Sequence, residues 1–320
     1  MHLTTGLSPM PCLTTDAAGV YVISVTPFAD DGRLDLASAD RLVEFYLERG
    51  ADGLTLLGMM GEAPKLTRDE SIAFVARILE SVAGRVPVVV GVSGSGYASM
   101  RELTEAVMER GAAGVMVAPP PHLRSDEQIL GYFAGVAEAV GAGTPFVLQD
   151  FPLSTGVVLS AAVIAQIARA HSNCVMLKHE DWPGLAKISA LRQAEGRGDM
   201  PRISILTGNG GVFLPEELAR GADGAMTGFG FPEMMVDVLR AHRDGEADYA
   251  RDLFDAYLPL ARYEQQPGLG LAVRKYVLAQ RGAMASAALR APGPRLSRDD
   301  IEDIECLLAR QARRLRELEH

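Results

Sequence analysis

Cysteine is scarce in this 320-residue sequence, and its placement excludes two classes of protein. Cys12, Cys174 and Cys306 lie far apart, are odd in number and form no CxxC pair. Such spacing supports neither a disulfide framework nor a zinc knot, and it fits a reducing compartment. We therefore expect a cytoplasmic protein.

Long apolar runs and an excess of positive charge are absent as well. No stretch approaches the roughly 18 apolar residues that span a bilayer, and residues 1–15 have neither a basic segment nor a continuous apolar one. The 31 Lys and Arg residues face 41 Asp and Glu residues, which gives a formal net charge of −10. This balance argues against nucleic acid or a membrane as partner and favours a small molecule.

The sequence is rich in short β-prone runs that alternate with stretches of helical period, which is typical of parallel βα units. Eight such units follow one another from Gly19. Strands are predicted at residues 20–25, 53–57, 86–92, 114–118, 145–148, 174–177, 203–206 and 224–226. Helices predicted between them include residues 38–49, 68–82, 99–110, 127–139 and 161–170.

Eight consecutive units close naturally into a (β/α)8 TIM barrel, which is the fold we predict. The phrase Arg-Gly-Ala-x-Gly recurs at residues 49–53, 110–114 and 220–224, as internal repetition in a barrel would give. A doubly wound sheet is the alternative, but its GxGxxG motif does not follow the first strand. We divide the chain into a loose N-terminal tail (1–18), the barrel (19–245) and a C-terminal helical extension (246–320).

Lys178 is the most informative residue, because it places an ammonium group at the end of the apolar run 174–177. A buried ammonium is costly unless it is paired or neutral, and the neutral amine is the nucleophile that forms Schiff bases. The alternative is a structural lysine that pairs with Glu180 or Asp181.

Two positional arguments favour a catalytic Lys178. Catalytic residues of (β/α)8 barrels cluster at the carboxyl ends of the strands, where this lysine falls. Side chains alternate along a strand, so Cys174, Met176 and Lys178 are expected to share one face. If Met176 points into the barrel, Lys178 does too.

Glycine-rich or polar segments follow other predicted strands. The segment Gly58-Met59-Met60-Gly61-Glu62 leaves backbone N–H groups open for a carboxylate, although a tight turn with two core methionines is the alternative. Residues 207–211 and 227–231 occupy positions where barrels often hold an anion. Gln149 and Asp150 follow the fifth strand and can orient a ligand or water, or satisfy loop backbone.

A metal site is the main competing chemistry. Its candidate ligands are His122, Asp150, His179 and Glu180. No HxH or HExxH spacing supports such a site, so we expect neither a metal nor another cofactor.

These residues resemble the dihydrodipicolinate synthase and N-acetylneuraminate lyase family of class I aldolases and dehydratases. The resemblance covers roughly residues 19–308 in order and spacing. Its marks are Thr26-Pro27-Phe28, Gly58-x-x-Gly61-Glu62, Pro152-x-x-Thr155-Gly156, Lys178 and Gly221-x-x-Gly224.

The resemblance implies that Lys178 forms a Schiff base with the ketone of pyruvate or another 2-oxo acid. The iminium is an electron sink, so that a C–C bond can form or break, or a hydroxyl can leave, beside it. The resemblance also implies a homo-oligomer, either a dimer or a tetramer. The expected substrate-binding residues are Gly58, Met59, Met60, Thr155, Asn209, Met226 and Thr227.

Several positions depart from the family pattern. The family usually has Thr or Ser where Met59 and Met60 stand, and the apolar pair favours a hydrophobic or aromatic acceptor over a polyhydroxy sugar acid. The acid/base tyrosine of the family aligns with Gln149, whose amide cannot titrate near neutral pH. The arginine that recognises dicarboxylic substrates aligns with Ser154, and a relay tyrosine aligns with the Pro120-Pro121 region. We therefore do not expect condensation of pyruvate with aspartate semialdehyde.

The preferred hypothesis is a class I, metal-independent lyase in which Lys178 is the nucleophile and Gln149 orients the substrate or a water. Candidates for proton transfer are Asp150, Glu180, His122 and water. The departures also allow a barrel that binds a ligand without turnover. A metal-dependent barrel enzyme is the third hypothesis.

Overall fold

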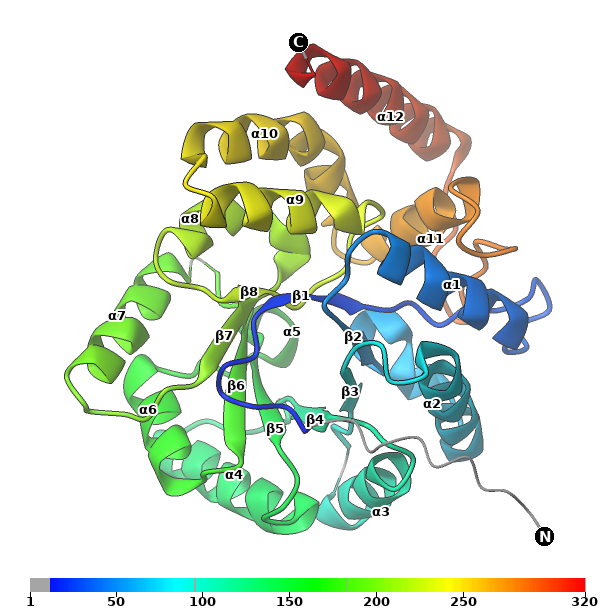
Figure 1. The fold of residues 1–320 in the computed structure, drawn as a ribbon. Coiled ribbons are helices and arrows are strands. Elements are labelled where there is room, and N and C mark those ends of the chain that lie inside the picture. Colours follow the sequence, from blue (N-terminus) through cyan, green and yellow to red (C-terminus); the bar gives the residue numbers. More distant parts are fainter. Residues whose placement is uncertain (1–11, 95, 183, 320) are drawn as a thin grey trace, which may run out of the picture.

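The computed structural model describes residues 12–94, 96–182 and 184–319. Eight parallel strands form a closed barrel in the order of the chain, and helices surround it (Figure 1). The strands are β1 (Gly19–Ile23), β2 (Gly53–Leu56), β3 (Val88–Gly91), β4 (Gly114–Val117), β5 (Phe146–Asp150), β6 (Cys174–His179), β7 (Ser204–Thr207) and β8 (Gly224–Ala225). The predicted (β/α)8 barrel is thus confirmed.

Helices are present at the five predicted regions between the strands, with bounds that differ by a few residues, and further helices between the strands were not predicted. Together they are α1 (Leu36–Glu48), α2 (Arg68–Val82), α3 (Tyr97–Met108), α4 (Asp126–Val140), α5 (Pro152–Thr155), α6 (Ala161–Ala170), α7 (Leu185–Gly196), α8 (Leu214–Leu218) and α9 (Pro232–Arg243). Short 3-10 turns η1 (Met59–Gly61), η2 (Ala63–Lys65) and η3 (Asn209–Gly211) follow β2 and β7. Helices α2 and α4 begin at capping boxes on Thr67 and Ser125, which satisfy the first free N–H groups.

The recurring Arg-Gly-Ala-x-Gly phrase forms one turn used three times. Gly50, Gly111 and Gly221 each have a positive φ, between 80° and 97°, which glycine adopts at little cost. In each turn the N–H of the next alanine donates to a carbonyl five residues back in the preceding helix. The repeat therefore sets how three helices return to the barrel.

Two apolar layers stabilise the strands. Side chains on the outer strand faces pack against the helices, whereas an inner cluster fills the barrel. The inner cluster contains Tyr21, Ile23, Val89, Met116, Val147, Val175, Met176, Leu206 and Met226. Alternation of side chains along each strand produces the two layers.

The prediction that the Cys174 side chain lies on the same strand face as Met176 is wrong. The register between β5 and β6 shifts so that Phe146 pairs with Cys174 while Val147 pairs with Met176. The extra residue, Val175, reverses the alternation at this point, and Cys174 joins the outer layer. Met176 still points into the barrel, as predicted, and burial raises the pKa of the Cys174 thiol to about 12.

The expected loose tail is wrong for residues 12–18, whereas residues 1–11 lie outside the described part of the chain. Leu13 and Ala17 pack against the inner cluster, and the Leu13 N–H donates to the Ala113 carbonyl over 2.8 Å. The hydroxyl of Ser204 donates to the Ala17 carbonyl over 2.6 Å. In Figure 1 this segment crosses the end of the barrel where the strands begin. It is held because it covers apolar side chains there.

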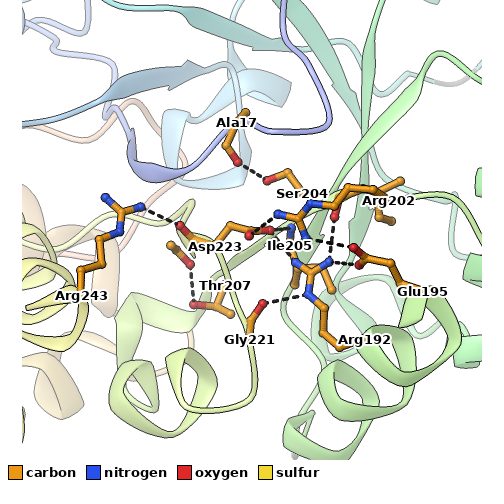
Figure 2. A network of polar contacts seen from close by, with 12 residues as sticks. Ala17, Arg192, Glu195, Arg202, Ser204, Ile205, Thr207, Gly221, Asp223 and Arg243 are labelled. Carbon is orange, nitrogen blue, oxygen red and sulfur yellow. Dashed lines mark hydrogen bonds and ion pairs between the residues drawn. The ribbon is translucent and has the colours of Figure 1, made fainter. Parts of the chain in front are cut away.

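A charged network ties β7, β8 and α7 together at the same end (Figure 2). The Asp223 carboxylate accepts hydrogen bonds from Arg192 and Arg202, each over 2.5 Å, and from the backbone N–H of Ile205 over 2.8 Å. In (β/α)8 barrels this end contributes to stability, whereas active sites lie at the opposite end.

Three further helices follow the barrel: α10 (Ala247–Glu264), α11 (Gly270–Gln280) and α12 (Arg298–Leu318). Helix α10 packs between α9 and α12, and α12 extends away from the barrel (Figure 1). Among residues 12–94, 96–182 and 184–319, none of the helices is long and apolar enough to cross a membrane.

Replacement of Asp223 by asparagine tests the network in Figure 2. We expect Asp223→Asn to lower the free energy of unfolding by about 2 kcal/mol, because two guanidinium groups lose their charged acceptor. Urea denaturation followed by circular dichroism measures this difference. Asp248→Asn, at a fully exposed carboxylate, is the matched control and should be neutral. Equal stability of the two variants would contradict the assigned role.

Candidate active site

Lys178 lies inside β6 rather than beyond its end, because β6 continues to His179. It pairs in register with Gln149 of β5 and Leu206 of β7, near the carboxyl end of the barrel. Its side chain is 6% exposed, and its Nζ lies 2.9 Å from Oε2 of Glu180. The ion pair that the sequence offered as a structural alternative therefore exists, at a position suited to catalysis.

Glu180 links Lys178 to Gln149. The same Oε2 atom accepts a hydrogen bond from Gln149 Nε2 over 2.7 Å. The backbone of Glu180 is also fixed, since its N–H donates to the Asp150 carbonyl and its carbonyl accepts from Asn209 Nδ2. A buried amine, carboxylate and amide thus lie in direct contact.

Gly208 makes room for this carboxylate. A Cβ atom at Gly208 would lie 2.2 Å from Cγ of Glu180, closer than nonbonded atoms approach. The glycine-rich segment after β7 is thus required by packing against Glu180. From the sequence, Glu180 is one of four proton-transfer candidates, and only its contacts in the fold distinguish it from the others.

A cavity of about 550 Å³ opens beside this group of residues. Gln149 lies in its wall, whereas Lys178 and Glu180 do not line it and are connected to it through the hydrogen bond between Gln149 and Glu180. Other lining residues include Gly58, Met59, Ser93, Met116, Pro119, Pro120, Pro121, His122, Ser154 and Thr155. The cavity volume is within the range of small-molecule sites.

The 58–62 loop has backbone N–H groups without partners in its own turn, and its residues Gly58 and Met59 line the cavity. Within η1 the N–H groups of Gly61 and Glu62 donate to the carbonyls of Gly58 and Met59. The leading N–H groups of a helical turn, here those of Met59 and Met60, have no partner within the turn. The hydroxyl of Thr26 holds the loop from β1 by donating to the Gly61 carbonyl over 2.6 Å.

The other predicted binding residues differ in whether they line the cavity. Thr155 lines the cavity, but its hydroxyl donates to the Phe151 carbonyl. The Thr227 hydroxyl accepts the Gly210 N–H, and Asn209 adopts a positive φ of 51° beside it. Met226 is fully buried in the inner cluster, against which Met60 also packs. Met226 and Met60 therefore belong to the apolar interior of the barrel, and neither lines the cavity.

Asp150 does not face the cavity, which corrects its prediction as a proton-transfer group. Gln149 and Asp150 are consecutive in β5, so their side chains point to opposite faces of the strand. The Asp150 side chain lies on the outer face, where Lys187 Nζ donates to it over 2.7 Å. His179 lies on the same side, with Nδ1 3.7 Å from the Asp150 carboxylate. Burial raises the pKa of the nearby Glu217 to about 7, opposed by Thr207 and His179.

The proposed metal ligands do not converge. His122 is exposed and lines the cavity, whereas Asp150 and His179 lie behind β5 and β6. In the part of the chain that the structure describes, no group of three or more His, Cys, Asp or Glu side chains is arranged to hold a metal ion.

Comparison with known proteins gives one consistent family. The profile of the Dihydrodipicolinate synthetase family matches residues 16–311. The L-2-keto-3-deoxyarabonate dehydratase of Azospirillum brasilense is 35% identical over 296 residues, which are 91% of this chain and 94% of that protein.

Solved structures agree with this assignment. Dihydrodipicolinate synthase from Rhodopseudomonas palustris has a TM-score of 0.92 and 52% identity, covering 94% of this chain and 99% of its own. YagE from Escherichia coli K12, solved in complex with pyruvate, has a TM-score of 0.83 and 27% identity, covering 92% and 99%. The prediction from the sequence is confirmed: the chain belongs to the dihydrodipicolinate synthetase family of lyases that act on pyruvate or another 2-oxo acid.

Proposed function

We propose that this protein is a metal-independent dehydratase of a 3-deoxy-2-oxo acid that works through a Schiff base on Lys178. The contact of Lys178, Glu180 and Gln149 at the cavity carries the proposal. The similarity to an L-2-keto-3-deoxyarabonate dehydratase supports dehydration as the reaction. A hydroxyl on C4 is the chemical requirement for the substrate.

The first step is attack by Lys178 on the ketone. The Glu180 carboxylate, 2.9 Å from Nζ, takes a proton from the ammonium and leaves a nucleophilic amine. The amine attacks C2 of the 2-oxo acid to form a carbinolamine. Glu180 then gives its proton to the carbinolamine hydroxyl, which leaves as water, so that the iminium forms and Glu180 is again a carboxylate. The N–H groups of Met59 and Met60 hold the substrate carboxylate, since charge-assisted hydrogen bonds to backbone are strong.

Elimination follows from the iminium. Glu180 takes the C3 proton, and the electron pair of the C3–H bond moves into an enamine. The enamine expels the C4 hydroxyl, which leaves as water with the proton that Glu180 held. Hydrolysis of the unsaturated iminium releases an unsaturated 2-oxo acid and returns the amine of Lys178. When C5 carries a hydroxyl, transfer of a proton from C5 to C3 gives the C4–C5 enol, which tautomerises to the C5 aldehyde.

Gln149 has a positioning part in this scheme. Its amide cannot titrate near neutral pH, so it cannot replace the family tyrosine as an acid or base. It instead fixes the Glu180 carboxylate through a 2.7 Å hydrogen bond. The proposed acid/base group is therefore Glu180, two residues after Lys178, and not the residue of β5 that aligns with the family tyrosine.

Dehydration also explains how a site with Met59 and Met60 can accept a hydroxylated substrate. Met59 and Met60 favour an apolar acceptor in a condensation or cleavage reaction, but a dehydration needs no acceptor because water is the leaving group. Ser93, His122 and Ser154 in the cavity wall offer hydrogen bonds to the hydroxyl groups of an acid. We also propose a homo-oligomer, a dimer or a tetramer, as is common for soluble enzymes.

Reductive trapping tests the nucleophile. Borohydride with pyruvate or 2-oxobutyrate should attach the ligand to the peptide that contains Lys178, because an iminium is reduced to a stable amine. Mass spectrometry of the digested protein locates the adduct, and Lys178→Ala should show none. Ligand-induced stabilisation that survives in Lys178→Ala, with no adduct in the wild type, would instead favour a binding protein.

Replacement of Glu180 separates adduct formation from turnover. We expect Glu180→Gln to lower kcat by about 100-fold or more, since an amide cannot take the C3 proton. A reducible adduct should still accumulate on prolonged incubation, because water or buffer can take the ammonium proton in place of Glu180. Asp181→Asn is the matched control, because that adjacent carboxylate pairs with Lys187 outside the barrel. Equal losses in the two variants would remove Glu180 from the mechanism.

Turnover identifies the reaction and its metal requirement. With L-2-keto-3-deoxyarabonate as substrate we expect release of a dehydrated 2-oxo aldehyde, detected by coupled oxidation or mass spectrometry. Rates should be unchanged by EDTA, because proton transfer is assigned to side chains. Cleavage to pyruvate and an aldehyde, or loss of activity with the chelator, would contradict the proposal.

A further inference from the structure

Helix α11 places two cationic residues, Arg274 and Lys275, next to each other in the interior of the protein. Arg274 is 2% exposed and Lys275 is completely buried. Both belong to the C-terminal extension, outside the eight βα units. Buried cations are rare because their desolvation is costly, so the contacts that they make need an explanation.

Lys275 reaches the loop that follows β2. Its Nζ donates to Oε1 of Glu62 over 2.6 Å and to the Ala288 carbonyl over 2.9 Å. The same ammonium lies 4.6 Å from the centre of the Phe28 ring. Burial lowers the pKa of Lys275 to about 8, and the Glu62 carboxylate opposes this shift.

Glu62 is the last residue of the 58–62 loop, and its conformation is unusual. Its φ is 54°, in the left-handed region that few residues other than glycine adopt. Its second carboxylate oxygen accepts from Lys65 Nζ over 2.8 Å and from the Arg290 N–H over 3.1 Å. Contacts on both oxygens therefore hold the side chain, and through it the end of the loop.

We propose that Lys275 is a positioning residue for binding of the substrate carboxylate. Through Glu62 it keeps the 58–62 loop in the turn that points the Met59 and Met60 N–H groups at the cavity. The inference rests on the proposed function of this loop. Lys275 touches no substrate, and its effect is on the geometry of groups that do.

Arg274 provides a matched comparison within the same helix. Its Nε donates to Glu264 over 2.5 Å, and the other oxygen of Glu264 accepts the Gly230 N–H over 2.9 Å. Arg274 therefore holds the segment that follows β8 and leaves the 58–62 loop to Lys275. Both residues are buried cations paired with a buried carboxylate, so their replacement disturbs the protein in a comparable way.

The experiment compares two probes in the trapping reaction, pyruvate and its neutral amide, pyruvamide. The half-saturating concentration of each probe is measured by borohydride trapping on the full-length wild type, Lys275→Met and Arg274→Met. We expect Lys275→Met to raise the value for pyruvate about tenfold, because misplaced N–H groups lose charge-assisted bonds. The value for pyruvamide should change far less. Arg274→Met should keep the wild-type ratio between the probes.

Folding of the variants is monitored by thermal denaturation. If Lys275→Met is insoluble, Glu62→Gln/Lys275→Met removes both charges, avoids an unpaired buried carboxylate and should show the same change in ratio. Lys275→Arg, which keeps a cation, should restore part of the preference for pyruvate. If adducts still form, two results would overturn the proposal. One is a wild-type ratio between the two probes in the Lys275 variants, and the other is an equal loss of the preference for pyruvate in Arg274→Met. A wild type that forms no adduct with either probe would refute the proposed function and this inference with it.

Discussion

The contact between the Lys178 ammonium and the Glu180 carboxylate is the interaction on which the site depends. Each charge alone would be costly to bury, and their 2.9 Å contact, with the Gln149 amide, offsets that cost. In the proposed mechanism the same contact lets the two groups exchange a proton when a substrate arrives. Structural pairing and catalytic use of Lys178 are therefore compatible, since one carboxylate can serve both.

The two ends of the barrel have different physical roles. At the end where the strands begin, residues 12–18 cover the inner apolar cluster and Asp223 joins two arginines to β7. At the other end, a cavity is lined mostly by apolar side chains, glycine and proline, with a few polar side chains among them, such as those of Gln149 and His122. Rigidity at one end permits loops at the other to be shaped for a ligand.

The C-terminal extension connects these loops to the rest of the chain. Adjacent residues of α11 reach the segments after β2 and β8, each through a buried carboxylate. Such pairs are specific in geometry because a displaced partner would leave a charge without compensation. Arg274 and Lys275 themselves do not line the cavity.

The sequence by itself determined the eight strands, the reused glycine turn and the position of Lys178 near a strand end. These features follow from periodicity, turn chemistry and the cost of burying charge, all of which are local. The face of Cys174 could not be predicted, because an irregular register between β5 and β6 reverses the alternation.

Tertiary structure alone decided which polar residues meet. Asp150 and Glu180 are both carboxylates near strand ends, yet one pairs with Lys187 behind the wall and the other with Lys178 inside it. Lys275 and Glu62 are 213 positions apart in the chain, and only packing of α11 brings them to 2.6 Å. Contacts between such distant residues depend on the whole fold, which no local pattern of residues contains.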